Sequence, residues 1–228
     1  MEEKSLYQAQ AAQAGGVDSV LATNKVLKNT YILLSMTLVF SAVTAGISMA
    51  VNPPPFTGLV CSGLAMLLLW FGLGRTANSA AGIYMVFAIT GLLGFGLGPL
   101  LNAYTATANG SALVMQALGG TGIVFFTLSG YALTTRKDFS YMGGFLFTGL
   151  IVALLAIVAN IFLQIPALSL AISSAVILIM SGLILYDTSR IINGGETNYI
   201  LATIGLYLSL YNIFVHLLHL LSAFSGDD

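Results

Sequence analysis

Charged residues are scarce in this sequence, and their scarcity excludes several classes of protein. The chain of 228 residues has 7 basic and 8 acidic side chains, so only 7% of it is charged. Soluble proteins carry about 25%, so these few charges cannot cover the surface of a water-soluble domain. Nucleic-acid binding and intrinsic disorder are disfavoured for the same reason. Cys61 is the single cysteine, which excludes a disulfide-stapled scaffold within one chain.

Hydrophobic residues make up 57% of the chain, and the mean hydropathy is +0.95. A helix needs about 20 apolar residues to cross a bilayer, and the sequence offers seven such runs. We therefore predict an all-α polytopic membrane protein whose helices lie in the lipid bilayer. The expected spans are 29–51, 56–74, 80–101, 112–134, 142–163, 167–186 and 200–222.

Polar segments flank this membrane domain. Residues 1–28 are mixed and polar and contain no apolar core of a signal peptide, so we expect a cytosolic N-terminal tail that is not cleaved. The transmembrane domain then covers 29–222, and 223–228 form a short C-terminal tail.

Prolines mark several of the breaks between spans. Residues 53–55 are three consecutive prolines, which remove three backbone donors and end the first helix. Pro99 and Asn102 are expected to close the third span, and the segment 164–166 separates the fifth from the sixth. A re-entrant turn at 164–166 would reduce the count to six spans.

The basic residues decide between these topologies. With seven alternating spans, all of them fall on one side: Lys4, Lys25, Lys28, Arg75, Arg136, Lys137 and Arg190. Basic residues accumulate in short cytoplasmic loops. The sequence therefore predicts seven spans with the N-terminus inside and the C-terminus outside, because six spans would move Arg190 to the other side.

One carboxylate approaches the membrane interior and is a candidate functional residue. Asp187 lies at the inner end of the sixth span, where an ionisable side chain is costly. It could pair with Arg190 three residues further along the same helix. Alternatively, it faces the bundle and forms a gate with an arginine from another span, for which Arg75 is the candidate.

The last span carries a polar stripe. Ser209, Asn212, His216 and His219 recur at steps of three and four, so they share one helical face, which Thr203 and Gly205 extend. Lipid cannot satisfy polar groups. The stripe therefore faces protein, as interhelical hydrogen-bonding groups, or water, as the lining of a pore. A pH-sensing role for the histidines stays open.

Catalytic patterns are missing. The sequence has no HExxH, no GxSxG and no phosphate-binding loop. Two histidines without a third ligand make a poor metal site. We therefore expect no enzyme activity, no cofactor and no bound metal.

Three segments near the C-terminus carry a family resemblance: LYDTSRII at 185–192, GGETNY at 194–199 and LYLSLYNIF at 206–214. Together they resemble the Bax inhibitor-1 (transmembrane Bax inhibitor motif) family, and in particular its proteobacterial branch. The resemblance implies a fold in which six helices surround a central seventh. It also implies a multi-pass protein of the bacterial inner (plasma) membrane with a cytoplasmic N-terminus.

The resemblance implies two functions. The proteobacterial branch modulates a membrane-anchored AAA protease complex, which is a non-enzymatic role in membrane protein quality control. Other members are pH-sensitive leaks for Ca²⁺ or protons, in which an aspartate at the position of Asp187 pairs with a second aspartate on the last helix. A basic residue on the second span, for which Arg75 is the counterpart, holds that pair. Here Ser209 occupies the second position, and a serine cannot raise the pKa of a neighbouring carboxylate as a second carboxylate does.

Overall fold

The computed structural model describes the backbone of residues 2–226 and the side chains of residues 23–226. The described residues form helices and no strand. In chain order these are α1 (Glu2–Val51), α2 (Thr57–Leu67), the π-helix η1 (Leu68–Leu73), α3 (Gly74–Thr76), α4 (Ala81–Thr105), α5 (Gly110–Thr135), the 3₁₀ turn η2 (Ser140–Met142), α6 (Gly143–Leu163), α7 (Pro166–Ile192) and α8 (Tyr199–Ser225). Within them lie 7 segments long and apolar enough to cross a membrane. The all-α, seven-span prediction is confirmed.

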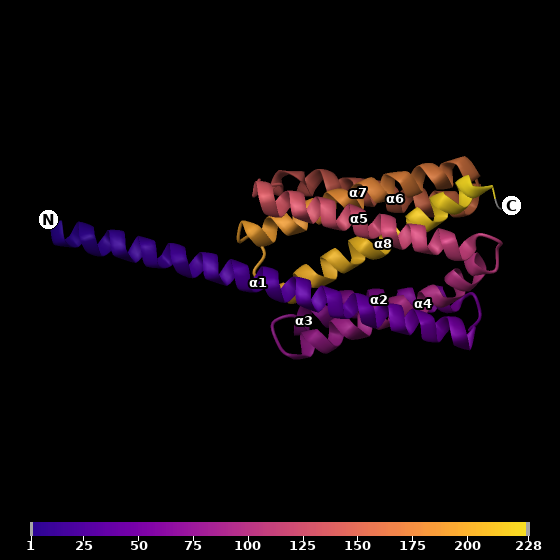
Figure 1. Cartoon of the computed structure of the whole chain (residues 1–228), viewed down its shortest axis with the longest axis horizontal. Helices are drawn as coiled ribbons and strands as arrows, with labels where there is room; N and C mark the ends of the chain where they lie inside the picture. Colours follow the sequence, from indigo (N-terminus) through magenta and orange to yellow (C-terminus); the bar gives the residue numbers. More distant parts are fainter. Residues whose placement is uncertain (1, 227–228) are drawn as a thin grey trace.

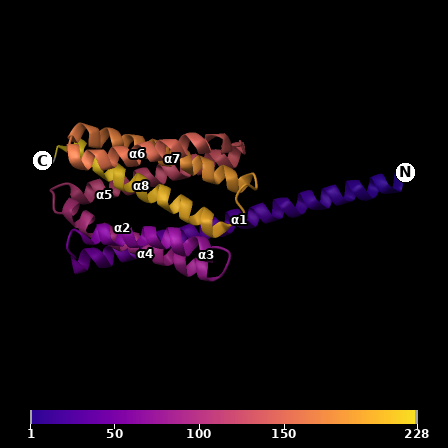
Figure 2. The same ribbon diagram turned by 180° about the vertical axis from the view of Figure 1, so that it is seen from behind.

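The helices form two layers with the last helix between them. α5, α6 and α7 lie on one side, and α1, α2 and α4 lie on the other (Figures 1 and 2). α8 runs obliquely from one layer to the other and packs against α1, α4, α5 and α7. Its most apolar window is 56% buried, the largest value among the seven spans. The full ring of six helices around it stays a prediction.

The first helix is longer than its membrane span. α1 has 50 residues, whereas its apolar portion is Thr23–Val51. At about 1.5 Å per residue, the residues before Thr23 add about 30 Å to the helix, and Figure 1 shows this part projecting beyond the bundle. The chain therefore enters the membrane domain without a turn.

Two helix boundaries differ from the sequence prediction. α4 continues through Pro99 to Thr105, so that proline does not end the third span. A proline interior to a helix is tolerated in a membrane when neighbouring helices satisfy the freed backbone groups. α7 continues to Ile192, so Asp187 lies inside the helix and Arg190 lies in its last turn.

The turn between α6 and α7 is a true reversal. Gln164 adopts a left-handed conformation (φ 51°), Ile165 is extended, and Pro166 begins the next helix. Because α6 and α7 are separate spans, the re-entrant alternative is excluded. The turns after α3, α5 and α7 lie at the end of the bundle from which α1 projects (Figure 1). Which side of the membrane this end faces stays a prediction.

Glycines allow α1 and α4 to approach closely. A Cβ on Gly94 would collide with the Ser41 carbonyl and the Thr44 hydroxyl, and one on Gly98 would collide with the Ser48 side chain. Small residues of this kind let membrane helices pack backbone to backbone, where van der Waals contact stabilises them. The spacing from Gly94 to Gly98 thus builds the seam between α1 and α4.

Candidate functional site

Asp187 faces the last helix. Its side chain is half-buried. A Cβ atom added to Gly205 of α8 would lie only 2.9 Å from the Asp187 Oδ2. Gly205 is thus the residue of α8 that makes room for the carboxylate. The structure therefore brings together two of the residues that the sequence singled out, and the carboxylate points into the bundle.

Arg190 does not pair with Asp187. Its guanidinium lies 3.5 Å from Glu196 Oε2, donates to the Gly195 carbonyl at 2.9 Å and sits 5.5 Å above the ring of Tyr186. The Arg190 guanidinium thus binds two residues of the α7–α8 loop. Among residues 23–226 this is the one ion pair, so Asp187 has neither Arg190 nor Arg75 as a salt-bridge partner.

Arg75 lies on α3, at the same end of the bundle, and its side chain is exposed. The preceding segment η1 is a π-helix, a form found frequently at functional sites. The described structure does not join this arginine to the carboxylate, so its assignment to a gate stays a prediction.

The polar stripe of α8 is divided between two kinds of contact. His216 Nδ1 lies 3.0 Å from Ser173 Oγ, and His219 Nε2 lies 3.1 Å from Ser169 Oγ. Both contacts join α8 to α7. Asn212 instead donates to the Leu208 carbonyl of its own helix at 2.8 Å, and Ser209 is buried at 2% exposure. The histidines therefore act as interhelical hydrogen-bonding groups in this structure.

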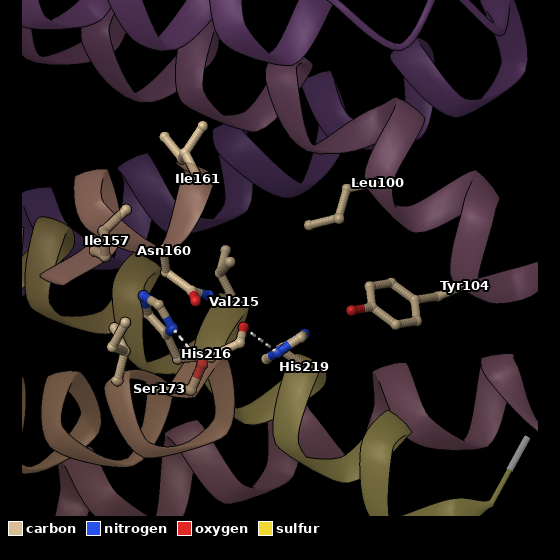
Figure 3. A pocket seen from close by; sticks show the side chains of 11 residues that line it. Leu100, Tyr104, Ile157, Asn160, Ile161, Ser173, Val215, His216 and His219 are labelled. Carbon is tan, nitrogen blue, oxygen red and sulfur yellow. Dashed lines mark hydrogen bonds between the residues drawn. The ribbon is translucent and has the colours of Figure 1, made fainter. Parts of the chain in front are cut away.

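These histidines also line a pocket of about 470 Å³ between α4, α6, α7 and α8. Figure 3 shows these two histidines together with Asn160 and Tyr104. The amide of Asn160 and the hydroxyl of Tyr104 point into the pocket. The pocket lies near the end of the bundle opposite the projecting part of α1. Its complete lining is Leu100, Tyr104, Ile157, Asn160, Ile161, Ser169, Ile172, Ser173, Val215, His216 and His219.

Asn198 ties the beginning of α8 to the turn before α4. Its Oδ1 accepts from the backbone of Ile200 at 2.9 Å, which caps the helix. Its Nδ2 donates to the Ala77 carbonyl at 2.9 Å and to Asn78 Oδ1 at 2.8 Å. One amide thus fixes two loops that are 120 residues apart in the sequence.

Sequence reasoning did not identify several of these residues. Asn198 appeared only as part of the GGETNY motif, and Ser169 and Ser173 were not assigned as partners of the histidines. Tyr207 received no role, yet it is buried between α1 and α4. The signal that could have found the serines was their spacing, because residues at i and i+4 share the helical face that the histidines of α8 need.

The fold and the buried contacts define a seven-helix membrane protein without a recognisable catalytic constellation among its described residues. A family model described as "Inhibitor of apoptosis-promoting Bax1" matches residues 23–226. The chain belongs to this Bax inhibitor family. The resemblance inferred from the C-terminal motifs is confirmed.

Curated relatives support the same assignment. The chain is 56% identical over 209 residues to the Modulator of FtsH protease YccA of Escherichia coli K12, covering 92% of this chain and 94% of that protein. The same identity and coverage hold for the Inner membrane protein YccA of E. coli O6:H1. A membrane protein of Vibrio cholerae is 48% identical over 216 residues, covering 95% of this chain and 97% of the relative.

Proposed function

We propose that this protein is a non-enzymatic modulator of a membrane-anchored AAA protease of the FtsH type, in the bacterial inner membrane and with its N-terminus in the cytoplasm. The likeness to YccA over 92% of the chain carries this proposal. The protein would act by engaging the protease complex in the membrane and changing the rate at which other membrane proteins are degraded.

Two structural features support a modulator. The portion of α1 before Thr23 projects from the bundle, where a cytosolic ATPase could reach it (Figure 2). The α1–α4 seam, in contrast, is packed so closely that glycines are required at positions 94 and 98. A chain with an accessible end and a tightly packed body can be engaged by the protease and still resist extraction.

The test measures two half-lives in cells that contain the protease: that of this protein and that of a membrane-protein substrate. Deletion of residues 2–22 should lengthen the half-life of the protein and abolish its effect on the substrate. Deletion of residues 226–228, which follow α8, is the matched control and should change neither. Unchanged half-lives for both proteins after removal of residues 2–22 would overturn the proposal.

A second candidate function is a leak for Ca²⁺ or protons. It is favoured by the half-buried Asp187 carboxylate, which faces Gly205 of α8 and has no ion-pair partner among residues 23–226. An ionisable group inside a span is a functional candidate because its burial is costly. The carboxylate would be the group that a permeating cation meets.

Purified protein in liposomes tests the leak. Cation flux should exceed that of empty liposomes and should fall in Asp187→Asn. Asp138→Asn is the matched control, because Asp138 lies in the α5–α6 loop and is exposed. Flux equal to that of empty liposomes at every pH tested would remove this function and leave the modulator standing.

A further inference from the structure

The pocket beside the two histidines contains polar groups that no protein contact uses. Asn160 Oδ1 accepts from the backbone of Ile165 at 3.2 Å, and this leaves its Nδ2 as a donor. Each histidine uses one ring nitrogen toward a serine of α7 and retains the other. Within residues 23–226, the Tyr104 hydroxyl has no hydrogen-bonding partner either, although the ring lines the pocket. Donors are thus available in an otherwise apolar space.

The arrangement of these donors is specific. In Figure 3 the Asn160 amide and the Tyr104 hydroxyl point into the pocket from opposite sides, with His219 between them. The walls are aliphatic and come from α4, α6, α7 and α8: Leu100, Ile157, Ile161, Ile172 and Val215. A volume of about 470 Å³ falls in the range of small-molecule sites. An apolar pocket with few convergent polar groups is the usual form of a ligand site.

The lining also restricts the charge of a ligand. It contains no lysine, arginine, aspartate or glutamate, and its titratable side chains are the two histidines. A permanently charged ligand would lose part of its hydration without gaining a permanently charged partner, which is unfavourable. The available side chains instead match an uncharged molecule that accepts hydrogen bonds.

The pocket lies at the depth where amphiphiles place their polar groups. Tyr104 is one residue from the end of α4, and Asn160 is three residues from the end of α6. These positions are within about 5 Å of the helix ends at 1.5 Å per residue. α6 has 21 residues and so measures about 30 Å, the thickness of the hydrocarbon core. The donors therefore lie near the edge of the hydrocarbon core, beside the aliphatic wall.

We propose that this pocket binds an uncharged membrane amphiphile through its carbonyl oxygens. Asn160 and Tyr104 donate to the carbonyl groups, and the aliphatic residues contact the apolar body. A quinone headgroup has this chemistry, because it is a flat ring with carbonyl oxygens on opposite edges. The ester carbonyls of a neutral glycerolipid are the other source. This site is independent of the proposed protease modulation and lies at the other end of the bundle from the projecting part of α1.

Binding of two radiolabelled probes to the purified full-length protein in detergent micelles tests the proposal. One probe is a short-chain ubiquinone analogue, and the other is a short-chain diacylglycerol; unlabelled probe in excess defines specific binding. We expect saturable binding of the quinone analogue. Saturable binding of diacylglycerol alone would assign the site to lipid ester carbonyls and leave the carbonyl-binding proposal intact. Lack of saturable binding for both probes would overturn it.

Two variants locate the binding in this pocket. Tyr104→Phe removes one donor and should raise the Kd about 10-fold, the equivalent of one hydrogen bond. Ile157→Trp fills the space and should abolish saturable binding. Their matched controls are Tyr84→Phe and Phe162→Trp, at side chains that are 77% and 81% exposed, and neither should change the Kd.

The same measurements define the result that would overturn the proposed site. Equal Kd values for wild type, Tyr104→Phe and Ile157→Trp would show that any bound probe lies elsewhere, which overturns the site. If Ile157→Trp does not fold, as judged by its thermal unfolding, Tyr104→Phe decides the question alone, because it keeps the ring and removes only the hydroxyl.

Discussion

The Tyr207 hydroxyl lies 2.6 Å from Ser41 Oγ, which joins the last helix of the bundle to the first. The same hydroxyl donates to the Thr90 carbonyl of α4 at 3.3 Å. Tyr207 is 1% exposed and Ser41 7%, so both side chains are buried. One side chain thus connects α1, α4 and α8 in the interior of the bundle.

Replacing Tyr207 with Phe should therefore destabilise the protein. The ring still fills its site, but the Ser41 hydroxyl loses a partner. We expect a loss of about 1–2 kcal/mol in the free energy of unfolding, measured by unfolding in mixed micelles. Tyr84→Phe, at an exposed ring, is the control and should be neutral. Equal stabilities for the two variants would show that the hydroxyl contributes nothing.

A glycine in the α1–α4 seam and a glycine outside it should respond differently to substitution by alanine. Gly94→Ala places a methyl group against the Ser41 carbonyl and should cost about 1–3 kcal/mol, as overpacking does. Gly119→Ala meets no atom within 4 Å and should be neutral or stabilise α5 by up to about 1 kcal/mol. Thermal unfolding of both variants checks this. A stable Gly94→Ala protein would mean that the seam can open without cost.

Asn198 combines a helix cap with a bridge between loops, and two substitutions separate the roles. Asn198→Asp keeps an oxygen for the cap of α8 but loses the donor to the Ala77 carbonyl. Asn198→Ala loses both the cap and the bridge. Its free energy of unfolding should be about 1 kcal/mol lower than that of Asn198→Asp, which is the usual value of a cap. Asn109→Ala is the control, because Asn109 precedes α5 without a side-chain cap. Amide hydrogen exchange at residues 77–80 should increase in both Asn198 variants but not in the control.

The contact between His216 and Ser173 predicts an energetic coupling between α7 and α8. A double-mutant cycle with His216→Leu and Ser173→Ala should give a coupling of about 0.5–2 kcal/mol. The same cycle with Ser174→Ala should give none, because Ser174 is exposed and bonds to the Leu170 carbonyl of its own helix. A coupling as large for Ser174 would mean that the histidine acts through the helix as a whole.

Most of the fold was accessible from the sequence because a bilayer allows few solutions. The apolar runs had to be helices, and the basic residues required an odd number of spans. The error at Pro99 has a physical cause: a membrane helix tolerates an interior proline when neighbouring helices satisfy the freed backbone groups, and α4 continues through Pro99. The predicted sixth span stopped at residue 186 because it counted only the apolar run, whereas α7 continues through Asp187 and Arg190 to Ile192.

The candidate site was less accessible because it depends on contacts between helices. The periodicity of α8 correctly placed His216 and His219 on one face, but it could not identify Ser169 and Ser173 as their partners. Arg190 has two acidic residues near it in the sequence, Asp187 and Glu196. In the structure the loop after α7 brings Glu196 to the guanidinium, and these two residues form the ion pair. The sequence spacing of Asp187 and Arg190 gave no indication of this choice.

The continuity of α1 has a mechanical consequence. A flexible linker would absorb a pull on the N-terminus by straightening, but a helix that enters the bundle without a turn passes the load directly to its membrane span. The load then falls on the seam where Gly94 and Gly98 meet α1, and on the Ser41–Tyr207 hydrogen bond. The force needed to dislodge the first span would therefore set the threshold at which the whole protein can be unravelled from that end.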